Sequence, residues 1–208
     1  MREVLLLRSN GLTIERQAGA SVDVLAHVAE RTLLEAVSAS PIALDQLASR
    51  AKRAVFRTGS PPVSVTDDDA MASFRAWGPG ARAALDEAIE QLSAPALSAG
   101  ITLTLWPHAA DVLSDIPSCL SLLRKFESVE LIVQPRDLLT ETMLPRAEEH
   151  LARIFEAFET HPRLFAFADG CDLGQGERHQ LPEPALRTLG RLLETTTKPV
   201  VFGNRAHP

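Results

Sequence analysis

The residues of this chain best suited to proton transfer lie directly after short apolar runs. His108 ends the run ITLTLWPH, and Arg136 and Asp137 follow the run VELIVQ. A histidine titrates near neutral pH, so His108 can act as acid or base with Asp137 as its carboxylate partner. Arg136 can hold a phosphate or carboxylate with two hydrogen bonds. Simpler alternatives stay open: His108 as a surface-loop residue, Asp137 as the cap of the next helix, and Arg136 as a solvated side chain.

A third polar segment follows the run LFAFA. It contains Asp169, Asp172, Glu177 and His179, interspersed with glycines. Three carboxylates and an imidazole can collect a metal weakly, but no strand holds these residues in place. We therefore favour a flexible loop over a dedicated metal site.

Six apolar runs have the length and composition of strands buried on both faces of a parallel sheet. They cover residues 3–8, 54–58, 101–106, 129–134, 164–168 and 199–202, with 42–44 as a further candidate. Helical patterns lie between them, over 22–37, from 67–69 onward, 81–97, 117–126, from 145 to before 162, and 184–194. This repeated order of strand and helix predicts an α/β domain, either a closed barrel or an open doubly wound sheet. No G-x-G-x-x-G follows an early strand, which counts against a nucleotide-binding open sheet.

Three segments resemble the xylose isomerase-like TIM-barrel family of sugar and sugar-phosphate isomerases and epimerases. SAGITLTLWPH resembles that family's helix end, Gly, strand and Glu-Pro-His, and ESVELIVQPRDLL its strand ending in Asp-Pro-x-His-Leu. LFAFADGCDLGQGE resembles its His-x-Lys-Asp strand and the Leu-Gly-x-Gly-Glu loop that follows. The resemblance covers roughly residues 81–204 and implies one TIM-barrel-like domain over 1–208. Because 208 residues are few for eight βα units, we expect a short barrel of six to eight strands, either closed or incomplete.

The resemblance also implies a divalent metal (Mn, Mg or Zn) held by Glu, Asp, His and Glu at the carboxyl ends of the strands. At the first three of these places this chain has Trp106, Gln134 and Ala166, and its last strand runs into Gly203 and Asn204. Indole and methyl groups cannot ligate a metal, and a neutral amide is a poor substitute for a carboxylate. We therefore predict that the metal ligands are replaced and that no cofactor is bound.

The same resemblance marks the residues expected to contact a sugar-like substrate. Strand alternation puts Trp106 on one face with Thr102 and Thr104, and we expect that face to point into the barrel. Trp106 can stack on a sugar or simply pack. Trp106, Gln134, Arg136 and Asp169 are the predicted binding residues, with His108 and Asp137 as catalytic residues.

Composition excludes several classes of protein. A net charge of −6 offers no basic face for nucleic acid, and we interpret the small basic group at 50–57 as a solvated helix end. The apolar run at 4–7 is too short for a signal peptide or a membrane span. Cys119 and Cys171 fit reduced thiols, so we expect a soluble, cytoplasmic protein.

Three functions remain open. The chain can be a divergent sugar isomerase or epimerase with a rebuilt site, or a degenerate barrel that binds a ligand or protein without turnover. It can also be a reduced domain that self-association completes.

Overall fold

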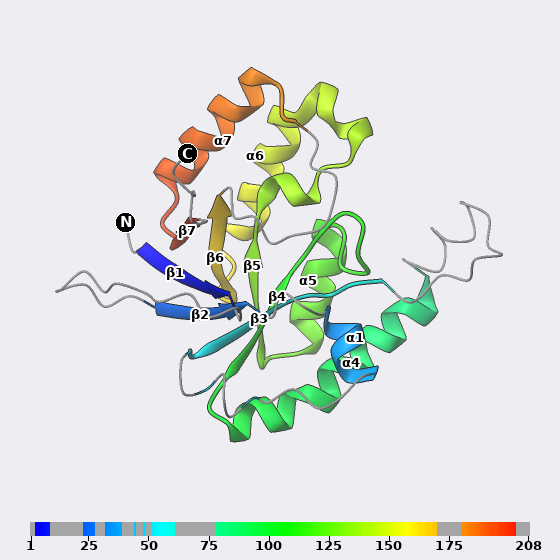
Figure 1. The fold of residues 1–208 in the computed structure, drawn as a ribbon. Helices are drawn as coiled ribbons and strands as arrows, with labels where there is room; N and C mark the ends of the chain where they lie inside the picture. Colours follow the sequence, from blue (N-terminus) through cyan, green and yellow to red (C-terminus); the bar gives the residue numbers. More distant parts are fainter. Residues whose placement is uncertain are drawn as a thin grey trace.

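Within the part of the chain that the structure describes, seven parallel strands form a closed barrel in the computed structural model (Figure 1). The structure describes residues 3–8, 23–27, 32–38, 44, 48, 51–60, 78–169 and 180–202. The strands are β1 (Glu3–Arg8), β2 (Asp23–His27), β3 (Arg53–Arg57), β4 (Thr102–Trp106), β5 (Val129–Val133), β6 (Leu164–Asp169) and β7 (Val200–Phe202). Each pairs with its neighbours in chain order, and β1 also pairs with β7, which closes the sheet. The prediction of a parallel TIM-barrel-like α/β fold is confirmed, with a strand number inside the expected range.

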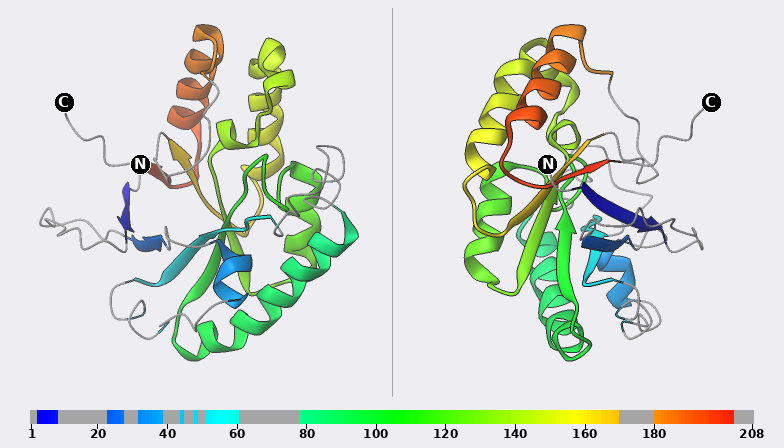
Figure 2. Two further views of the ribbon diagram at one scale, coloured as in Figure 1. Left: turned by 45° about the vertical axis from the view of Figure 1, so that its right-hand side comes forward. Right: turned by 90° about the vertical axis from the view of Figure 1, so that its left-hand side faces the viewer.

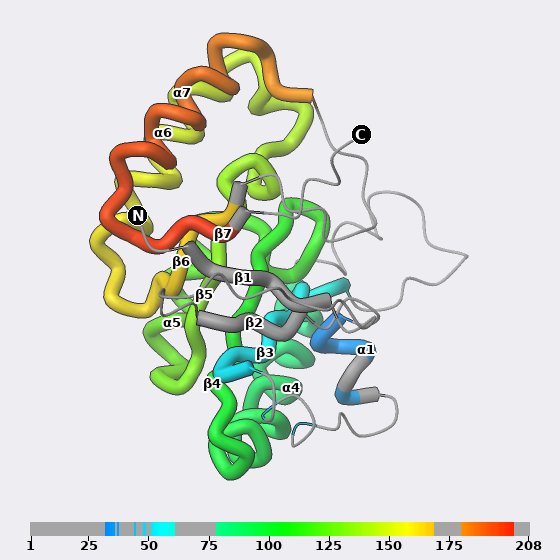
Figure 3. Tube along the Cα trace, turned by 60° about the vertical axis from the view of Figure 1, so that its left-hand side comes forward, coloured from blue at the N-terminus to red at the C-terminus, as the bar shows by residue number. Residues whose placement is uncertain are grey.

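The described helices lie outside the barrel, on the side of strands β3 to β7 (Figure 2). They are α1 (Leu33–Ser38), α4 (Pro79–Ser98), α5 (Ile116–Lys125), α6 (Ala147–Phe158) and α7 (Glu183–Thr195), with 3₁₀ helices η1 (Pro135–Leu138) and η2 (Glu141–Arg146) between β5 and α6. Figure 3 shows α6 beside α7 and α1 beside α4. The main hydrophobic core lies between these helices and the strands, where Phe155 of α6 stacks on Phe167 of β6 with ring centroids 4.2 Å apart.

The beginning of α5 is encoded locally. Asp115 accepts a hydrogen bond from the backbone N–H of Ser118 at 2.7 Å, and the hydroxyl of Ser118 accepts one from the N–H of Asp115 at 3.2 Å. This reciprocal cap, followed by Pro117, starts the helix where the sequence predicts it. It also anchors the loop between β4 and α5, which carries His108.

The predicted helix over 22–37 is wrong. Its first part, Asp23–His27, is β2, and only Leu33–Ser38 is helical. A short apolar run suits a buried strand as well as one turn of a helix, and periodicity alone cannot separate them. Pairing with β1 on one side and β3 on the other decides for a strand. Leu44 is helical, against the candidate strand at 42–44, while residues 42, 43 and 67–69 lie outside the described ranges.

The interpretation of 50–57 as a solvated helix end is also wrong. Arg53 and Arg57 lie at the two ends of β3, and both form ion pairs. The guanidinium of Arg53 lies 2.6 Å from the Glu130 carboxylate and 3.8 Å from the centre of the Phe165 ring. A strand with an apolar centre and a basic residue at each end can be buried when carboxylates from other parts of the chain pair with the basic side chains.

Cys119 is a free, buried thiol whose pKa is raised, chiefly by burial. Cys171 lies outside the described residues. Among the residues that the structure describes, no helix is long and apolar enough to cross a membrane.

Candidate functional site

The barrel interior is filled by a small apolar cluster, which we call the interior cluster. Its members come from five consecutive strands and are Val55, Trp106, Ile132, Ala166, Ala168 and Val201. A bulge in β6 lets Phe165 pack against this cluster as well, because Leu164 pairs with Leu131 while Ala166 pairs with Ile132. Trp106, Ala166 and Ala168 thus face inward, as the family resemblance implies.

Trp106 and Asp137 join the ends of β4 and β5. The indole of Trp106 is fully buried, and its Nε1–H donates to Oδ2 of Asp137 at 3.0 Å. Asp137 lies in η1, and the residues that cap η1, η2 and α6 are Gln134, Thr140 and Arg146. The capping alternative for Asp137 is therefore wrong, and its carboxylate lies at the carboxyl end of the barrel.

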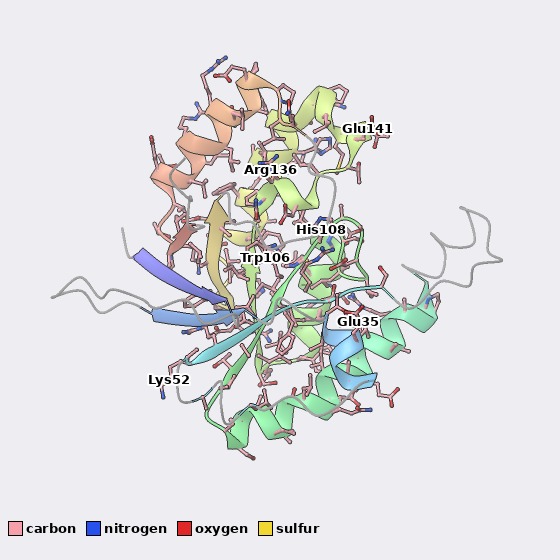
Figure 4. All side chains as sticks on the ribbon, in the orientation of Figure 1. Glu35, Lys52, Trp106, His108, Arg136 and Glu141 are labelled. Carbon is pink, nitrogen blue, oxygen red and sulfur yellow. The ribbon has the colours of Figure 1, made fainter. Side chains whose placement is uncertain are left out.

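His108 lies in the neighbouring loop, directly after β4. Its side chain is half-buried, and Nδ1 accepts a hydrogen bond from the backbone N–H of Ala110 at 3.0 Å. An imidazole that accepts at Nδ1 carries its proton on Nε2, so neutral His108 is a donor at Nε2. The N–H of Ala109 donates to the carbonyl of Asp137 at 2.7 Å, which holds the two loops together. Figure 4 shows Trp106, His108 and Arg136 in the region where β4 and β5 end.

Gln134 and Thr104 are buried polar side chains inside the barrel. Gln134 follows β5 and is 1% exposed, and Thr104 in β4 is fully buried. Neither the amide of Gln134 nor the hydroxyl of Thr104 forms a hydrogen bond with any residue that the structure describes. A buried polar group without a partner costs about 1–3 kcal/mol, so such groups usually mark a place where something else binds.

Arg57 and Asp111 form a buried ion pair that the sequence interpretation missed. The Nη2 of Arg57 lies 2.5 Å from Oδ1 of Asp111, and its Nε lies 3.1 Å from Oδ2. Asp111 also accepts the N–H of Gly59 at 3.1 Å. Gly59 has a φ of 75°, and a Cβ there would lie 2.4 Å from Oγ1 of Thr32. A signal existed only for Arg57, because it lies two residues after Val55, on the same face of a buried strand, and a cation there needs a partner.

The described residues do not fit a divalent metal. Where the resemblance places metal ligands, this chain presents an indole, an amide and a methyl group, which are poor or impossible ligands. No group of three His, Cys, Asp or Glu side chains within the described ranges is arranged to hold a metal ion. Loss of the metal ligands stays a prediction, and no step below depends on a metal.

Several predicted residues are not placed. Asp169 ends β6, where its backbone pairs with Phe202, but its side chain is outside the description. Asp172, Glu177, His179, Gly203 and Asn204 also lie outside the described residues. The structure thus brings together His108, Asp137, Trp106 and Gln134 at the ends of two adjacent strands, with Arg136 beside them in η1.

Among comparisons with known proteins, only the comparison with solved structures finds matches. No family model matches the chain, and no curated protein matches it. It is similar to a D-psicose 3-epimerase crystallised in the presence of D-fructose, with 14% identity over 88% of this chain and 64% of the other, and a TM-score of 0.45. It is also similar to a D-allulose 3-epimerase from Methylomonas sp., with 13% identity over 88% of this chain and 63% of the other, and a TM-score of 0.43. The chain spans less than two thirds of the length of either protein, and at these identities the likeness concerns the fold alone.

Proposed function

We propose that this chain binds a sugar-like polyol at the carboxyl end of its barrel and moves a proton between neighbouring carbons. It would be a divergent member of the sugar isomerase and epimerase barrels that works without a metal. Parallel βα barrels place their active sites at this end. The observation that carries the proposal is the joining of the loops after β4 and β5, through Ala109 to Asp137 and Trp106 to Asp137. This arrangement supports the assignment of His108 and Asp137 as an acid/base pair beside the barrel mouth.

Asp137 is the proposed base. It takes the proton from the carbon next to the substrate carbonyl, while the electron pair of that C–H bond forms the carbon–carbon double bond of an enediolate. Trp106 orients the carboxylate through its hydrogen bond to Oδ2. Return of the proton to the former carbonyl carbon, while the hydroxyl proton of the neighbouring carbon moves to the former carbonyl oxygen, isomerises the sugar. Epimerisation instead needs a proton delivered to the original carbon from the opposite face, for which solvent water is the proposed donor.

His108 is the proposed donor to the developing negative charge. The hydrogen bond from Ala110 to Nδ1 favours the tautomer with the proton on Nε2. That N–H can donate to the substrate oxygen that becomes negative in the enediolate. Gln134, Arg136 and Asp169 are proposed to bind the remaining hydroxyl groups.

A second candidate is a barrel that binds its ligand without turnover. The neutral amide of Gln134, buried where the resemblance places a charged metal ligand, favours this alternative. An amide can hold a sugar by hydrogen bonds, but it contributes less than a metal to stabilising an enediolate.

Solvent-deuterium exchange tests the proposal. The protein is incubated with D-fructose or D-psicose in D2O, and NMR follows deuterium entering the carbon next to the carbonyl. We expect exchange with the wild type and a loss of about 100-fold or more in Asp137→Asn, because general acid–base catalysis contributes at least this much.

Glu141→Gln is the matched control. Glu141 is an exposed carboxylate in η2, and its neutralisation should leave exchange unchanged. Absence of exchange under saturating ketose would refute the proposed enzymatic activity. Calorimetric binding without exchange would instead support the second candidate.

A further inference from the structure

The carboxylate of Asp111 anchors the segment that carries His108. Asp111 is 3% exposed and follows His108 closely, in the loop between β4 and α5. The guanidinium of Arg57, at the end of β3, binds both of its oxygens, and one oxygen also accepts the N–H of Gly59. One buried carboxylate therefore fixes the loop after β4 to the strand and the loop beside it.

The backbone of Asp111 is bonded to His108 itself. Its N–H donates to the carbonyl of His108 at 2.9 Å, and the N–H of His108 donates to the carbonyl of Leu113 at 3.0 Å. These bonds close a turn over residues 108–113, which we call the histidine turn. Within it the N–H of Ala110 donates to Nδ1 of the imidazole at 3.0 Å. The orientation of the ring therefore depends on the conformation of the histidine turn.

The loop after β3 holds the histidine turn from outside. The hydroxyl of Ser60 donates to the carbonyl of Ala110 at 2.8 Å, and the N–H of Leu113 donates to the buried hydroxyl of Thr58 at 3.4 Å. A short turn has few hydrogen bonds of its own, so contacts with a strand and its loop must keep it in one conformation. The ion pair of Asp111 is the charged contact among them.

We propose that Asp111 is a positioning residue for the proton transfer. Together with Arg57, it keeps the histidine turn in the conformation in which Ala110 binds Nδ1. Neutral His108 then carries its proton on Nε2, where the proposed mechanism needs a donor. Asp111 acts through His108 and not on the substrate. This inference rests on the proposed function and adds the group that sets the tautomer and orientation of its donor.

A second ion pair of β3 provides the matched control. Arg53, at the other end of the strand, binds the Glu130 carboxylate through Nε at 2.6 Å and Nη2 at 3.5 Å. Arg57 uses the same two nitrogens for Asp111, but only Asp111 is part of the histidine turn. Glu130→Gln and Asp111→Asn each replace the carboxylate of such a pair by an amide. A purely structural role predicts the same behaviour for both variants.

The ring nitrogens of His108 test the positioning without any substrate. In protein with ¹⁵N-labelled histidine, the signals of His108 are assigned by their absence in His108→Ala. They are measured at about pH 9, where an ordinary imidazole is neutral. We expect the proton on Nε2 in the wild type and in Glu130→Gln, and a mixture of both tautomers in Asp111→Asn. Unchanged nitrogen shifts in folded Asp111→Asn, or the same mixture in Glu130→Gln, would overturn the inference.

A double-mutant cycle tests the positioning in the reaction. Asp111→Asn should lower kcat for deuterium exchange about 10-fold or more and leave KM nearly unchanged, because a misplaced donor weakens the transition state more than substrate binding. In the His108→Ala background the same substitution should have no further effect, since nothing is left to position. Additive losses of the two substitutions would contradict a role through His108.

Ser60→Ala decides the question if Asp111→Asn does not fold. It removes one hydroxyl group, and with it the bond to the Ala110 carbonyl, while the ion pair stays intact. We expect a partial mixture of His108 tautomers and a several-fold lower kcat. Ring-nitrogen shifts equal to those of the wild type would then overturn the inference.

Failure of this inference can be told apart from failure of the proposed function. A wild type without ketose exchange, in which Asp111→Asn still changes the His108 tautomer, would count against the proposed function alone. Ketose exchange in the wild type, with the same tautomer in Asp111→Asn, would count against the positioning role alone.

Discussion

At the residue scale, the most informative side chain is Gln134, because its position is costly for folding. An amide could be replaced there by an apolar group of similar size without losing any hydrogen bond to a described residue. Burial of an unsatisfied polar group lowers stability, and proteins commonly accept that cost where a ligand needs the group. Gln134 therefore has the properties of a binding residue rather than a packing residue.

This cost predicts that removal of the buried polar groups stabilises the fold. Gln134→Leu and Thr104→Val should each raise the free energy of unfolding by about 1 kcal/mol in the absence of ligand, since each removes a buried group without a partner. Urea unfolding measures the change. Gln91→Leu, on the surface, should stay within about 0.5 kcal/mol of the wild type. A loss of stability in both interior variants would mean that these groups already have partners in the folded chain.

At the element scale, the loops after β3 and β4 are clamped together. The Asp111 carboxylate binds Arg57 from β3 and the backbone of Gly59, and the N–H of Val112 donates to the carbonyl of Gly59 at 2.9 Å. The hydroxyl of Ser60 adds a bond to the carbonyl of Ala110 at 2.8 Å. These bonds hold the segment that follows His108, so the position of the imidazole depends on an ion pair outside the proposed chemistry.

Loss of the ion pair between Arg57 and Asp111 should lower the free energy of unfolding substantially. Asp111→Asn leaves the largely buried guanidinium of Arg57 without its main counter-charge, and we expect a loss of about 3 kcal/mol in unfolding free energy. Glu183→Gln removes the partner of Arg187 in an exposed pair on α7 and should cost no more than about 0.5 kcal/mol. Denaturant unfolding of the two variants compares them directly, and equal effects would show that the clamp contributes little.

A second set of contacts connects the end of α6 to the start of β7. Glu159 accepts hydrogen bonds from the hydroxyl groups of Thr196 and Thr197 and from the N–H of Thr197 at 2.7 Å. Burial by itself raises the pKa of Glu159, but these hydrogen bonds and the charge of Lys198 outweigh it, so the pKa is lowered. The ionised carboxylate thus favours the folded state.

The lowered pKa sets the pH dependence. A carboxylate with a lower pKa in the folded state contributes stability above its unfolded pKa, and the contribution disappears as the pH falls through the folded value. Glu159→Gln should therefore cost about 1 kcal/mol at pH 7, and the difference from the wild type should shrink as the pH falls below about 4.3. Urea unfolding across this range tests it, with exposed Glu156→Gln as control. A difference that stays constant with pH would contradict the assignment.

At the scale of the whole molecule, the barrel has two unlike ends. The ion pair of Arg53 and Glu130, with Phe165 against the guanidinium, lies toward the amino ends of the strands. The carboxyl ends carry Trp106, His108 and Asp137. Every described strand pairs with two neighbours, so none of the described strands offers an open sheet edge with which a second copy of the chain could pair. Self-association stays a prediction, without pairing at a strand edge to drive it.

The response of the melting temperature to additives tests the site as a whole. We expect millimolar Mn²⁺, Mg²⁺ or EDTA to leave the melting temperature unchanged, because the described residues lack a fitting ligand set. A ketose at 100 times its Kd should stabilise the fold by about 2.7 kcal/mol, which corresponds to roughly 5–10 °C for a domain of this size. Loss of stability in EDTA that Mn²⁺ restores would establish a metal site and overturn the metal-free mechanism.

The sequence by itself determined the elements whose signals are local. The apolar runs that became β4, β5 and β6 are bounded by turn residues and buried on both faces, so their composition alone identifies them. The cap formed by Asp115 and Ser118 is likewise readable within four residues. Strand alternation put Trp106 on one face with Thr102 and Thr104, and the family resemblance implied that this face points into the barrel.

Only the tertiary structure decided which side chains form hydrogen bonds and ion pairs with one another. Trp106 and Asp137 are 31 positions apart and Arg57 and Asp111 are 54 apart, so their pairing depends on strand order and on closure of the barrel. The same holds for β2, whose short apolar run becomes a strand because β1 and β3 supply hydrogen bonds on both sides. Periodicity records how each side chain is buried locally, but it carries no information on which distant group meets it. For Gln134 the decisive fact was the lack of any described partner, which no sequence pattern could reveal.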